Sequence, residues 1–467
     1  MAAPPTPTTG VNLPAGKTAS SFMLELLRET KTRFPQAMGP VRLPATPRAL
    51  KRRYASLLVE VEQRRCASEA RVEIARSLRA AVLERCTLRG DDGSARPLDQ
   101  LDLETALPLD VEPFPGGDPR GWVPSFRYGD RAHRGHELAS VVDELEARRR
   151  VNAVTAATLR RALARLDDDG ALRLSPSTRF ALLGAGAELA PTRALLQAGA
   201  TVLWADVTAP PASLRREGGP LTCLRGRADL LTVPDRIGAS VAAFLDEAPA
   251  HVGLFAYGPG GGREWRIGAA MNAIVEALPR SHVLSVGMLV SPTTPVELEA
   301  DDAAAAEKTL AGIRGWRRVL WRARLLRPTR ARPDLPPVSD TIVPIQGMSY
   351  QAAQWLEKTM AAEVWRRDAE APLRVSANVA PITKTESMSH PLFKVGFRAA
   401  DTFGVEIFEP DVTRTLGTLM YVEDILGDDP PDRARQLHGG SFGLPYSGES
   451  ALAIATAIGF ARRPEKA

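Results

Sequence analysis

The spacing of hydrophobic positions changes near residue 170 and divides the chain into two parts. Before that point, apolar residues recur at three- and four-residue steps, as in Leu50, Tyr54, Leu57, Leu58 and Val61. This spacing is typical of amphipathic helices. We therefore predict a mostly helical N-terminal region over residues 21–170, in which the Pro-, Gly- and Asp-rich residues 89–134 form loop. Residues 1–20, rich in Pro, Thr and Ala, are predicted to be a disordered lead-in.

After residue 170, short apolar runs alternate with helical patterns. The runs predicted as strands cover residues 179–183, 201–205, 252–256 and 282–290. The helical patterns between them cover residues 189–198, 235–245 and 265–278. Strands that alternate with helices indicate a parallel sheet with helices on both faces. The fold class predicted for residues 171–467 is therefore α/β, with a doubly wound parallel sheet of Rossmann-like type.

Composition narrows the classes of protein to consider. Hydrophobic residues make up 44% of the 467 residues, which is typical of a soluble globular protein. The net charge of +5 is small for this length, so we expect no nucleic-acid partner. The three cysteines lie far apart, which argues against a disulfide framework and favours a cytoplasmic location. No apolar run is long enough to predict a membrane-spanning helix.

The turn after the first predicted strand carries the first candidate chemistry. Gly184 and Gly186 follow that strand and precede a predicted helix, with Glu188 at the end of the same turn. Gly184 permits a tight turn, and Gly186 lets a pyrophosphate approach backbone amides at the start of the helix. Asp206 ends the next strand, where a carboxylate can accept a hydrogen bond from a ribose 2′-hydroxyl. The pattern predicts a dinucleotide site made by these four residues.

The identity of the cofactor stays partly open at this turn. The carboxylate of Asp206 would repel a 2′-phosphate, which favours NAD, whereas Arg215 and Arg216 keep NADP possible. The third glycine of the usual fingerprint is absent. Methyltransferases that bind S-adenosylmethionine also have a Gly-rich turn followed by an acid, so they remain an alternative.

Downstream residues occur in an order that resembles a known family. Asn272 lies on the helix before the strand at residues 282–290, Ser291 follows that strand, Tyr350 opens a later helix, and Thr383 follows a further strand. Together with the Gly-rich turn, this order resembles the short-chain dehydrogenase/reductase superfamily. The resemblance covers the chain from about residue 180 onward. It implies binding of a nicotinamide cofactor and oxidoreductase chemistry.

The resemblance also implies roles for individual residues. Tyr350 would be the general acid or base, Ser291 would hold the substrate oxygen, and Asn272 would take the place of the asparagine on the family's helix. Gln354 and Thr383 would contact the cofactor.

The resemblance is divergent at the catalytic centre. The family lysine, four residues after the tyrosine, is replaced by Gln354, and the interval from Ser291 to Tyr350 is far longer than usual. The family's Asn-Asn-Ala-Gly motif is also rewritten. A phenol has a pKa of about 10, and the charge of the lysine lowers that pKa in the family, whereas glutamine is neutral. Lys358 and Lys384 are candidates to replace the missing charge.

The function that we expect is an NAD(P)-dependent oxidoreductase that reduces a carbonyl or enone of a small or lipophilic substrate. Two alternatives remain, a catalytically silent nucleotide-binding or scaffold protein and an S-adenosylmethionine-dependent methyltransferase. His133 and His136 lack the four-residue spacing that aligns two imidazoles on a helix, so no metal site is predicted. We also expect a homo-oligomer.

An Arg-rich insertion at about residues 300–340 separates Ser291 from Tyr350. Between residues 313 and 332 it contains eight arginines and no acid, together with Trp316 and Trp321. Arginines mixed with tryptophans and leucines are typical of a helix at a membrane interface. We therefore expect either a peripheral membrane or lipid-substrate contact, or a helix that packs on the N-terminal region and exposes its arginines to solvent.

Overall fold

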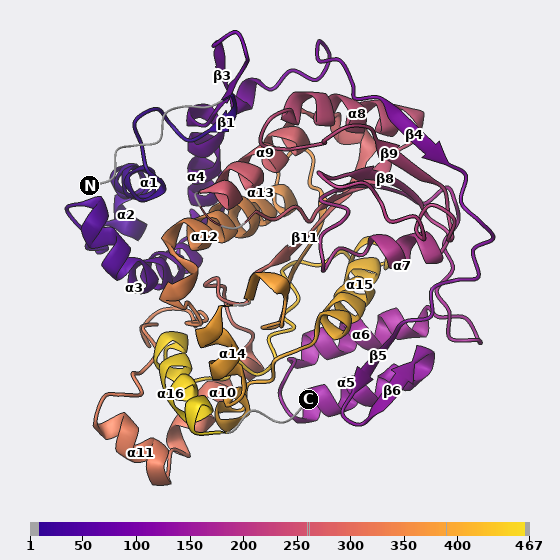
Figure 1. Cartoon of the computed structure of the whole chain (residues 1–467). Helices are drawn as coiled ribbons and strands as arrows, with labels where there is room; N and C mark the ends of the chain where they lie inside the picture. The colour runs from indigo at the N-terminus through magenta and orange to yellow at the C-terminus, as the bar shows by residue number, and fades with distance from the viewer. Residues whose placement is uncertain (1–8, 259, 261, 389, 463–467) are drawn as a thin grey trace.

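The structure is a computed structural model that describes residues 9–258, 260, 262–388 and 390–462. In these residues a seven-stranded sheet with helices on both faces forms an α/β fold, as predicted (Figure 1). The strand order is β12-β11-β10-β7-β8-β9-β4. The strands are β4 (Val111–Phe114), β7 (Arg179–Leu183), β8 (Thr201–Ala205), β9 (Leu221–Leu224), β10 (Ala250–Leu254), β11 (Val283–Val290) and β12 (Arg374–Val379). All pairs are parallel except that of β4 with β9.

The central strands are apolar along almost their whole length. In β7, every residue after Arg179 is buried, and β7 pairs with β8 in register from Arg179 opposite Thr201 to Leu183 opposite Ala205. A strand with both faces covered by helices has no polar face, which explains why β7 and β8 have the bounds that their apolar runs predict.

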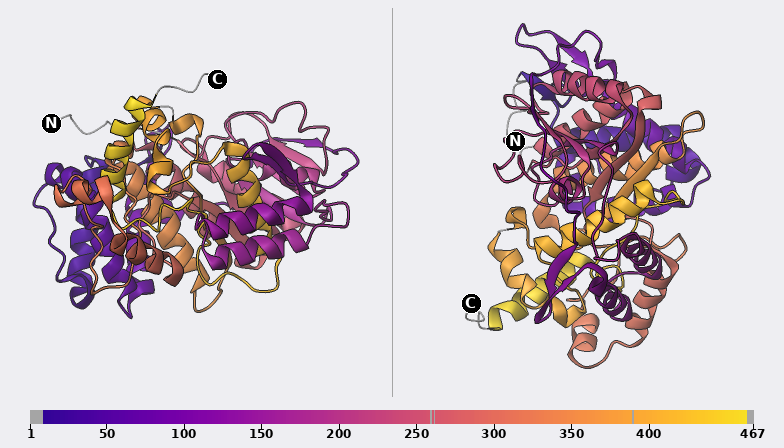
Figure 2. Two further views of the ribbon diagram at one scale, coloured as in Figure 1. Left: turned by 90° about the horizontal axis from the view of Figure 1, so that it is seen from below. Right: turned by 90° about the vertical axis from the view of Figure 1, so that its right-hand side faces the viewer.

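Helices form two hydrophobic cores with the two faces of the sheet (Figure 2). On one face lie α8 (Pro234–Glu247), α9 (Arg263–Ala277), α12 (Met348–Ala353), the π-helix η5 (Gln354–Met360) and α13 (Ala361–Arg366). Outside them pack α1 (Ala19–Arg33), α2 (Pro35–Met38), α3 (Pro47–Cys66) and α4 (Arg71–Arg85). On the other face lie α7 (Thr192–Gln197), α15 (Pro410–Leu426), α5 (Leu138–Ala147) and α6 (Ala153–Ala164).

A third apolar cluster holds together a smaller unit that we call the cap. The cap consists of α11 (Gly315–Arg322), α14 (Pro391–Phe397), η7 (Ala400–Phe403) and α16 (Gly448–Ala461). α10 (Ala300–Ala311) precedes it in the chain. Shorter elements are β1 (Gly10–Asn12), β2 (Thr87–Arg89), β3 (Ala95–Pro97), β5 (Ser125–Tyr128), β6 (Arg131–Arg134), η1 (Leu98–Gln100), η2 (Gly135–Glu137), η3 (Arg280–His282), η4 (Pro344–Gln346) and η6 (Glu386–Met388). Among the described residues, no helix has the length and apolar character needed to cross a membrane.

The region predicted as N-terminal and helical is distributed around the sheet. Helices α1–α4 share the core on one face, α5 and α6 share the core on the other, and β4 lies at the edge of the sheet itself. Residues 89–134 are mostly loop, as predicted, but the prediction missed the short strands β3, β4, β5 and β6. The edge position of β4 tolerates Pro113, because an edge strand has one side that needs no hydrogen-bond donor.

The prediction of a disordered lead-in was wrong for residues 9–20, the part of it that the structure describes. Residues 1–8 lie outside the described part of the chain, but Gly10–Asn12 forms β1 and pairs with β2. The Val11 side chain is fully buried, and its backbone N–H donates a hydrogen bond to Leu231 O at 2.7 Å. A Cβ on Gly10 would lie 2.0 Å from the same oxygen, so the approach requires glycine there.

Three further expectations differ from the structure. The helix after the Gly-rich turn begins at Thr192 rather than residue 189, because a residue directly before a proline, here Pro191, disfavours helical backbone. The resemblance to the short-chain dehydrogenase/reductase superfamily also implies a closing strand over residues 438–446, but these residues form a turn, since Gly439 and Gly440 both have positive φ. Between residues 313 and 332, where the arginines are concentrated, only α11 is helical, and Arg324 just beyond it has a φ of 58°.

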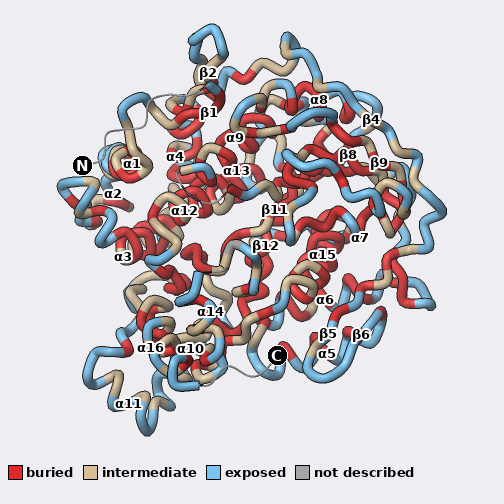
Figure 3. The backbone as a smooth tube through the Cα atoms, in the orientation of Figure 1, coloured by how far each residue is buried: buried red, intermediate tan, exposed pale blue. Residues whose placement is uncertain are grey.

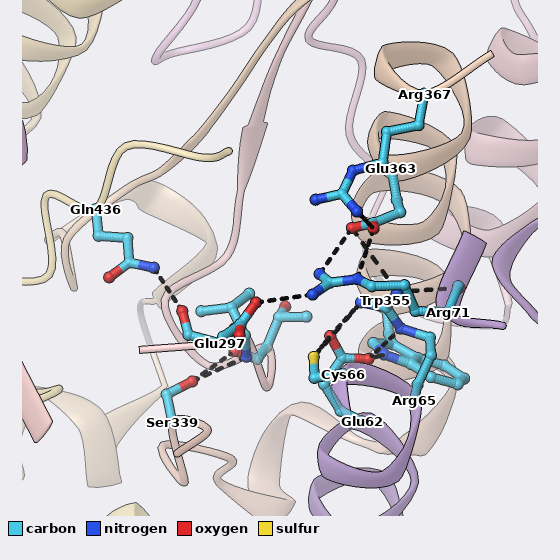
Figure 4. Close-up of polar contacts among 12 residues, drawn as sticks. Glu62, Arg65, Cys66, Arg71, Glu297, Ser339, Trp355, Glu363, Arg367 and Gln436 are labelled. Carbon is cyan, nitrogen blue, oxygen red and sulfur yellow. Dashed lines mark hydrogen bonds and ion pairs between the residues drawn. The ribbon is translucent and has the colours of Figure 1, made fainter. Parts of the chain in front are cut away.

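A buried polar network joins the N-terminal helices to the helix layer that faces the sheet (Figure 4). Glu62 and Arg65 on α3 form an ion pair at 2.7 Å, and each side chain is 1% exposed. Trp355 of η5 donates its indole N–H to Glu62 at 2.9 Å, and Arg71 of α4 pairs with Glu363 of α13 at 2.8 Å. Burial alone would raise the pKa of Glu363, but Arg65 and Arg71 lower it. The network therefore holds η5 against α3 through charges that are paired within it.

Candidate functional site

A cavity of about 1340 Å³ lies along the carboxyl edge of the sheet. Residues that directly follow β7, β8, β10, β11 and β12 line it, and it crosses the point between β7 and β10 where the strand order reverses. The chain leaves neighbouring strands in opposite directions at such a point, which creates a crevice for ligands. Thr18, Lys51 and Tyr54 bring the N-terminal helices into its wall, and the cap forms another wall.

The cavity gathers all but one of the predicted site residues. Those that line it are Gly184, Gly186, Glu188, Asp206, Ser291, Tyr350, Gln354 and Thr383. Asn272 is the exception, since it is fully buried inside α9 and donates its amide N–H to the backbone oxygen of Glu357 at 3.0 Å. The structure therefore places Asn272 in the contact between α9 and η5 rather than at the cavity.

The Gly-rich turn packs closely against the loop after β10. Gly184 has a φ of 82°, and a Cβ there would lie 2.2 Å from the backbone nitrogen of Ala256. Only glycine fits such a position without a backbone shift. Gly186 is exposed to the cavity, and its N–H donates to the Asp206 carboxylate at 3.0 Å. The turn thus couples the ends of β7 and β8.

Asp206 lies at the centre of the polar end of the cavity. Besides the Gly186 N–H, its carboxylate accepts hydrogen bonds of 2.9 Å from both the backbone N–H and the hydroxyl of Thr208. Ala228 and Asp229 complete this end of the lining. Arg215 does not line the cavity, and its guanidinium lies over the Phe114 ring at 5.2 Å from the ring centre.

Glu188 and Thr383 occupy the side of the cavity next to α15. Glu188 accepts a hydrogen bond from the backbone N–H of Glu386 at 3.2 Å. The Thr383 hydroxyl donates to Pro381 O at 2.9 Å and lies 2.8 Å from the Thr413 hydroxyl. Both residues tie the segment after β12 to the neighbouring turns.

Tyr350 and Ser291 meet in the middle of the cavity. Ser291 directly follows β11, Tyr350 lies in the first turn of α12, and both residues line the cavity. The Ser291 hydroxyl also lies 2.9 Å from the Thr293 hydroxyl. Tyr257, from the loop after β10, contacts the Tyr350 ring edge to face at 6.2 Å. Segments after β10 and β11 and the start of α12 therefore converge on one phenol.

Gln354 is held behind this pair by both ends of its amide. Its oxygen accepts the Ser291 backbone N–H at 3.0 Å, and its nitrogen donates to Glu264 at 2.7 Å. Glu264 also accepts the Gly258 N–H at 3.1 Å. Lys358 lines the cavity near Glu264, and its ammonium donates to Leu289 O at 2.8 Å.

Burial governs the protonation of the groups around Tyr350. Burial raises the pKa of Tyr350, Glu264 raises it further, and the nearby Ser291 hydroxyl lowers it only in part. Burial also raises the pKa of Glu264, against an opposing effect of Lys358, and burial lowers the pKa of Lys358. The phenol therefore stays neutral at physiological pH, in the form that donates a proton.

The opposite end of the cavity is apolar. The cap supplies its lining there, which includes Phe393, Phe397, Phe403, Leu444, Ala451 and Leu452. An apolar wall of this kind favours a hydrophobic ligand because its burial removes apolar surface from water.

Glu264 is the site residue that the sequence analysis missed. It lies in the first turn of α9, next to a Gly-rich segment, where a glutamate is ordinary on helix-capping grounds. Its role follows from its burial and its hydrogen bond with Gln354, and both depend on contacts between distant segments. An acid at the start of a predicted helix, directly after the Gly-rich residues 258–262 of the sequence, was the available signal.

Comparison of the chain with protein-family models gives no match, and no curated protein matches it. The family resemblance therefore stays a prediction. Any proposal of function depends on the geometry of the cavity.

Proposed function

We propose that the chain is an NAD(H)-dependent oxidoreductase with a Rossmann-like sheet, which reduces a carbonyl or enone of a lipophilic small molecule. The observation that carries the proposal is that Tyr350 and Ser291 line the same cavity as Gly186 and Asp206. The order β9-β8-β7-β10-β11-β12 supports it, because it matches the 3-2-1-4-5-6 order of dinucleotide-binding sheets.

The polar end of the cavity suits a dinucleotide that lacks a 2′-phosphate. Gly184 allows the tight turn beside Ala256, Gly186 faces the cavity where a pyrophosphate could approach, and Asp206 can accept hydrogen bonds from a ribose. Arg215, which would favour a 2′-phosphate, is directed onto Phe114 instead. We therefore favour NAD over NADP.

The chain's own residues would then handle the substrate oxygen. The cofactor, when bound, supplies a hydride to the substrate carbon. The neutral Tyr350 phenol donates its proton to the oxygen, and the Ser291 hydroxyl donates a hydrogen bond to the same atom. Because burial keeps the phenol protonated, this centre favours reduction over oxidation, which would need a phenolate base.

The size of the cavity supports a second ligand beside the cofactor. Its volume of about 1340 Å³ exceeds the roughly 300–1,000 Å³ that is usual for one drug-sized ligand. The polar end can take the dinucleotide, and the apolar end beside Phe393 and Phe403 can take the substrate.

A second candidate function is a nucleotide-binding protein without catalysis. The observation that favours it is the hydrogen bonding of Gln354. Its amide oxygen accepts the Ser291 N–H, and its amide nitrogen donates to Glu264. In this arrangement Gln354 supplies neither the positive charge of the family lysine nor a free ribose ligand. Tight cofactor binding without turnover is the outcome that this alternative requires.

Titration of the purified chain with three cofactors tests the proposal. NADH fluorescence should saturate, NADPH should bind more weakly, and S-adenosylmethionine should not compete. Gly186→Val should weaken NADH binding, because a Cβ at Gly186 already lies within 3.2 Å of Asp206 and Thr208. The melting temperature of the variant checks that it folds. Binding of S-adenosylmethionine alone would point to a methyltransferase instead.

Turnover then separates the enzyme from the silent binder. The rate of reduction of a panel of lipophilic aldehydes, ketones and enones is measured as the loss of NADH absorbance. Consumption of NADH that depends on one class of substrate supports the reductase. Tight binding of NADH with no turnover of any class supports the alternative.

A further inference from the structure

The surface of the cap around α11 combines exposed cations with exposed apolar side chains. Trp316, Val319 and Leu325 are 44%, 65% and 55% exposed. Figure 3 shows α11 at the periphery of the molecule, mostly in the colours of exposed and intermediate residues. Apolar groups that gather in one exposed patch, rather than scattered singly, mark an interaction site.

The cations of this surface have no acidic partners of their own. Arg314, Arg318, Arg322 and Arg324 are exposed, and within the described residues no ion pair involves any of them. By contrast, Arg327 at the end of the segment pairs with Glu449 at 3.0 Å. The charge of four neighbouring guanidinium groups is therefore available to an anionic surface.

The inner side of α11 packs against the rest of the cap. Trp316 contacts the Phe403 ring edge to face at 6.0 Å, and Trp321 contacts Tyr446 at 6.0 Å. Ile313 and Leu320 also pack on the apolar cluster of the cap. The expected alternative of a helix packed on the N-terminal region does not describe α11, whose apolar contacts are with the cap. The helix is thus anchored, with its arginines and part of its apolar stripe directed outward.

We propose that this surface binds an anionic lipid bilayer, with Trp316, Val319 and Leu325 in the interfacial region and the arginines at the headgroup phosphates. Val319 lies one turn from Trp316, and Arg322 lies one turn from Arg318, so an apolar stripe runs beside a cationic one. That pairing is the pattern of interfacial helices. An acidic protein with its own apolar patch would fit the same residues, and its binding is an outcome of the test below.

The position of the surface connects the bilayer with the cavity. Phe403 contacts Trp316 on one side and lines the apolar end of the cavity on the other. A lipophilic ligand that leaves the bilayer at α11 would meet the cap first. Membrane binding itself requires neither a cofactor nor turnover, so it can be tested independently of the proposed reaction.

Sedimentation of the full chain with vesicles tests the proposal. Vesicles that contain phosphatidylglycerol should bind the protein at low salt, and vesicles of phosphatidylcholine alone should bind it weakly. Raising the salt concentration should reduce binding, because exposed charges are screened by ions. The double variant Arg318→Glu/Arg322→Glu should lose about tenfold or more of the vesicle partition coefficient.

A matched control carries the same change of charge elsewhere. Arg193 on α7 and Arg225 after β9 are 51% and 60% exposed, and Figure 1 shows α7 and β9 on the opposite side of the molecule from α11. Arg193→Glu/Arg225→Glu should bind vesicles nearly as well as the parent chain. Equal loss in both double variants would mean that only net charge matters and would overturn the proposal.

The apolar side chains are tested separately from the arginines. Val319→Ser/Leu325→Ser should reduce the binding that persists at high salt, since these exposed residues contribute by burial in the interface. Absence of vesicle binding at low salt would overturn the proposal. Binding to soluble polyglutamate but not to vesicles would overturn it as well and would indicate an acidic protein partner.

Discussion

Tyr350 is the residue on which the proposed chemistry depends most directly. Tyr350→Phe should lower the turnover number for reduction by about 10²–10⁴-fold, because it removes the proton donor. Tyr257→Phe is the matched control, since Tyr257 contacts Tyr350 at 6.2 Å but is not the proposed donor. The raised pKa of Tyr350 also predicts that the rate should not fall on the alkaline side below about pH 10. Unchanged turnover in Tyr350→Phe would show that the chemistry lies elsewhere.

Asp206 should determine the preference between the two nicotinamide dinucleotides. Asp206→Ala removes the negative charge that would repel a 2′-phosphate, so the affinity for NADPH relative to NADH should rise by roughly tenfold. Thr208→Val is the control, because it removes one hydrogen bond to Asp206 and leaves the charge in place. Paired titrations with NADH and NADPH give the two ratios. Equal affinities in the parent chain would contradict this role.

Glu357 should make the stability of the fold depend on pH. Burial raises the pKa of Glu357 to about 7, while hydrogen bonding to Asn272 lowers it only in part. The folded state therefore holds a proton that the unfolded state releases above pH ~4.5, so stability falls as pH rises from about 4.5 to 7. The loss from this group is of the order of 3 kcal/mol. Urea denaturation at pH 5 and pH 8 should show a smaller loss in Glu357→Gln than in the parent chain.

The residues of the candidate site could be predicted where they directly follow a strand. Asp206 and Ser291 were predicted because β8 and β11 are mostly apolar runs that are followed by a polar residue. Glu264 and the hydrogen bonds of Gln354 could not be predicted, because they arise from contacts between α9, η5 and the segment after β11. The sequence identified polar residues at the strand ends but not the buried Glu264, which raises the pKa of Tyr350.

At the scale of elements, buried strands were easier to predict than exposed or irregular ones. β7 has four buried residues in a row, whereas β4 alternates exposed and intermediate residues and contains Pro113. The π-helix η5 has the same apolar character as the α-helices beside it, so its hydrogen-bond pattern leaves no clear sequence signal. π-helical turns are frequent at functional sites, and η5 carries both Gln354 and Lys358.

The buried ion network on α3 should be essential to the position of η5. Arg65→Met leaves the Glu62 carboxylate buried without its ion-pair partner, which should lower the free energy of unfolding by about 3–5 kcal/mol. The double variant Glu62→Leu/Arg65→Met leaves no uncompensated charge in this pair and should be markedly more stable than the single variant. Guanidinium denaturation of the three proteins measures the difference. A single variant as stable as the parent would show that the pair contributes little.

At the scale of the whole molecule, the alternation of strands and helices was sufficient to predict the α/β class but not the placement of the N-terminal helices. The helical pattern of α1–α6 shows that each has an apolar side. It does not show which surface covers that side. In the structure, Phe22 of α1 stacks on Trp265 of α9 at 5.2 Å, and α6 packs along α15. Such pairings join residues far apart in sequence, so hydrophobic periodicity alone does not determine them.

This arrangement predicts that residues 171–467 do not form a stable unit without the preceding segment. Removal of that segment would expose the sides of Trp265 and Trp355 that face α1 and α3, and it would take β4 from the edge of the sheet. Exposed apolar surface of this kind reduces the free energy of unfolding by roughly 25 cal/mol for each Å². The truncated chain should therefore bind a hydrophobic dye and lose its near-ultraviolet circular dichroism, while the full chain should unfold in one cooperative transition. A truncated chain with a native-like near-ultraviolet spectrum and its own cooperative transition would contradict a core shared between the two parts.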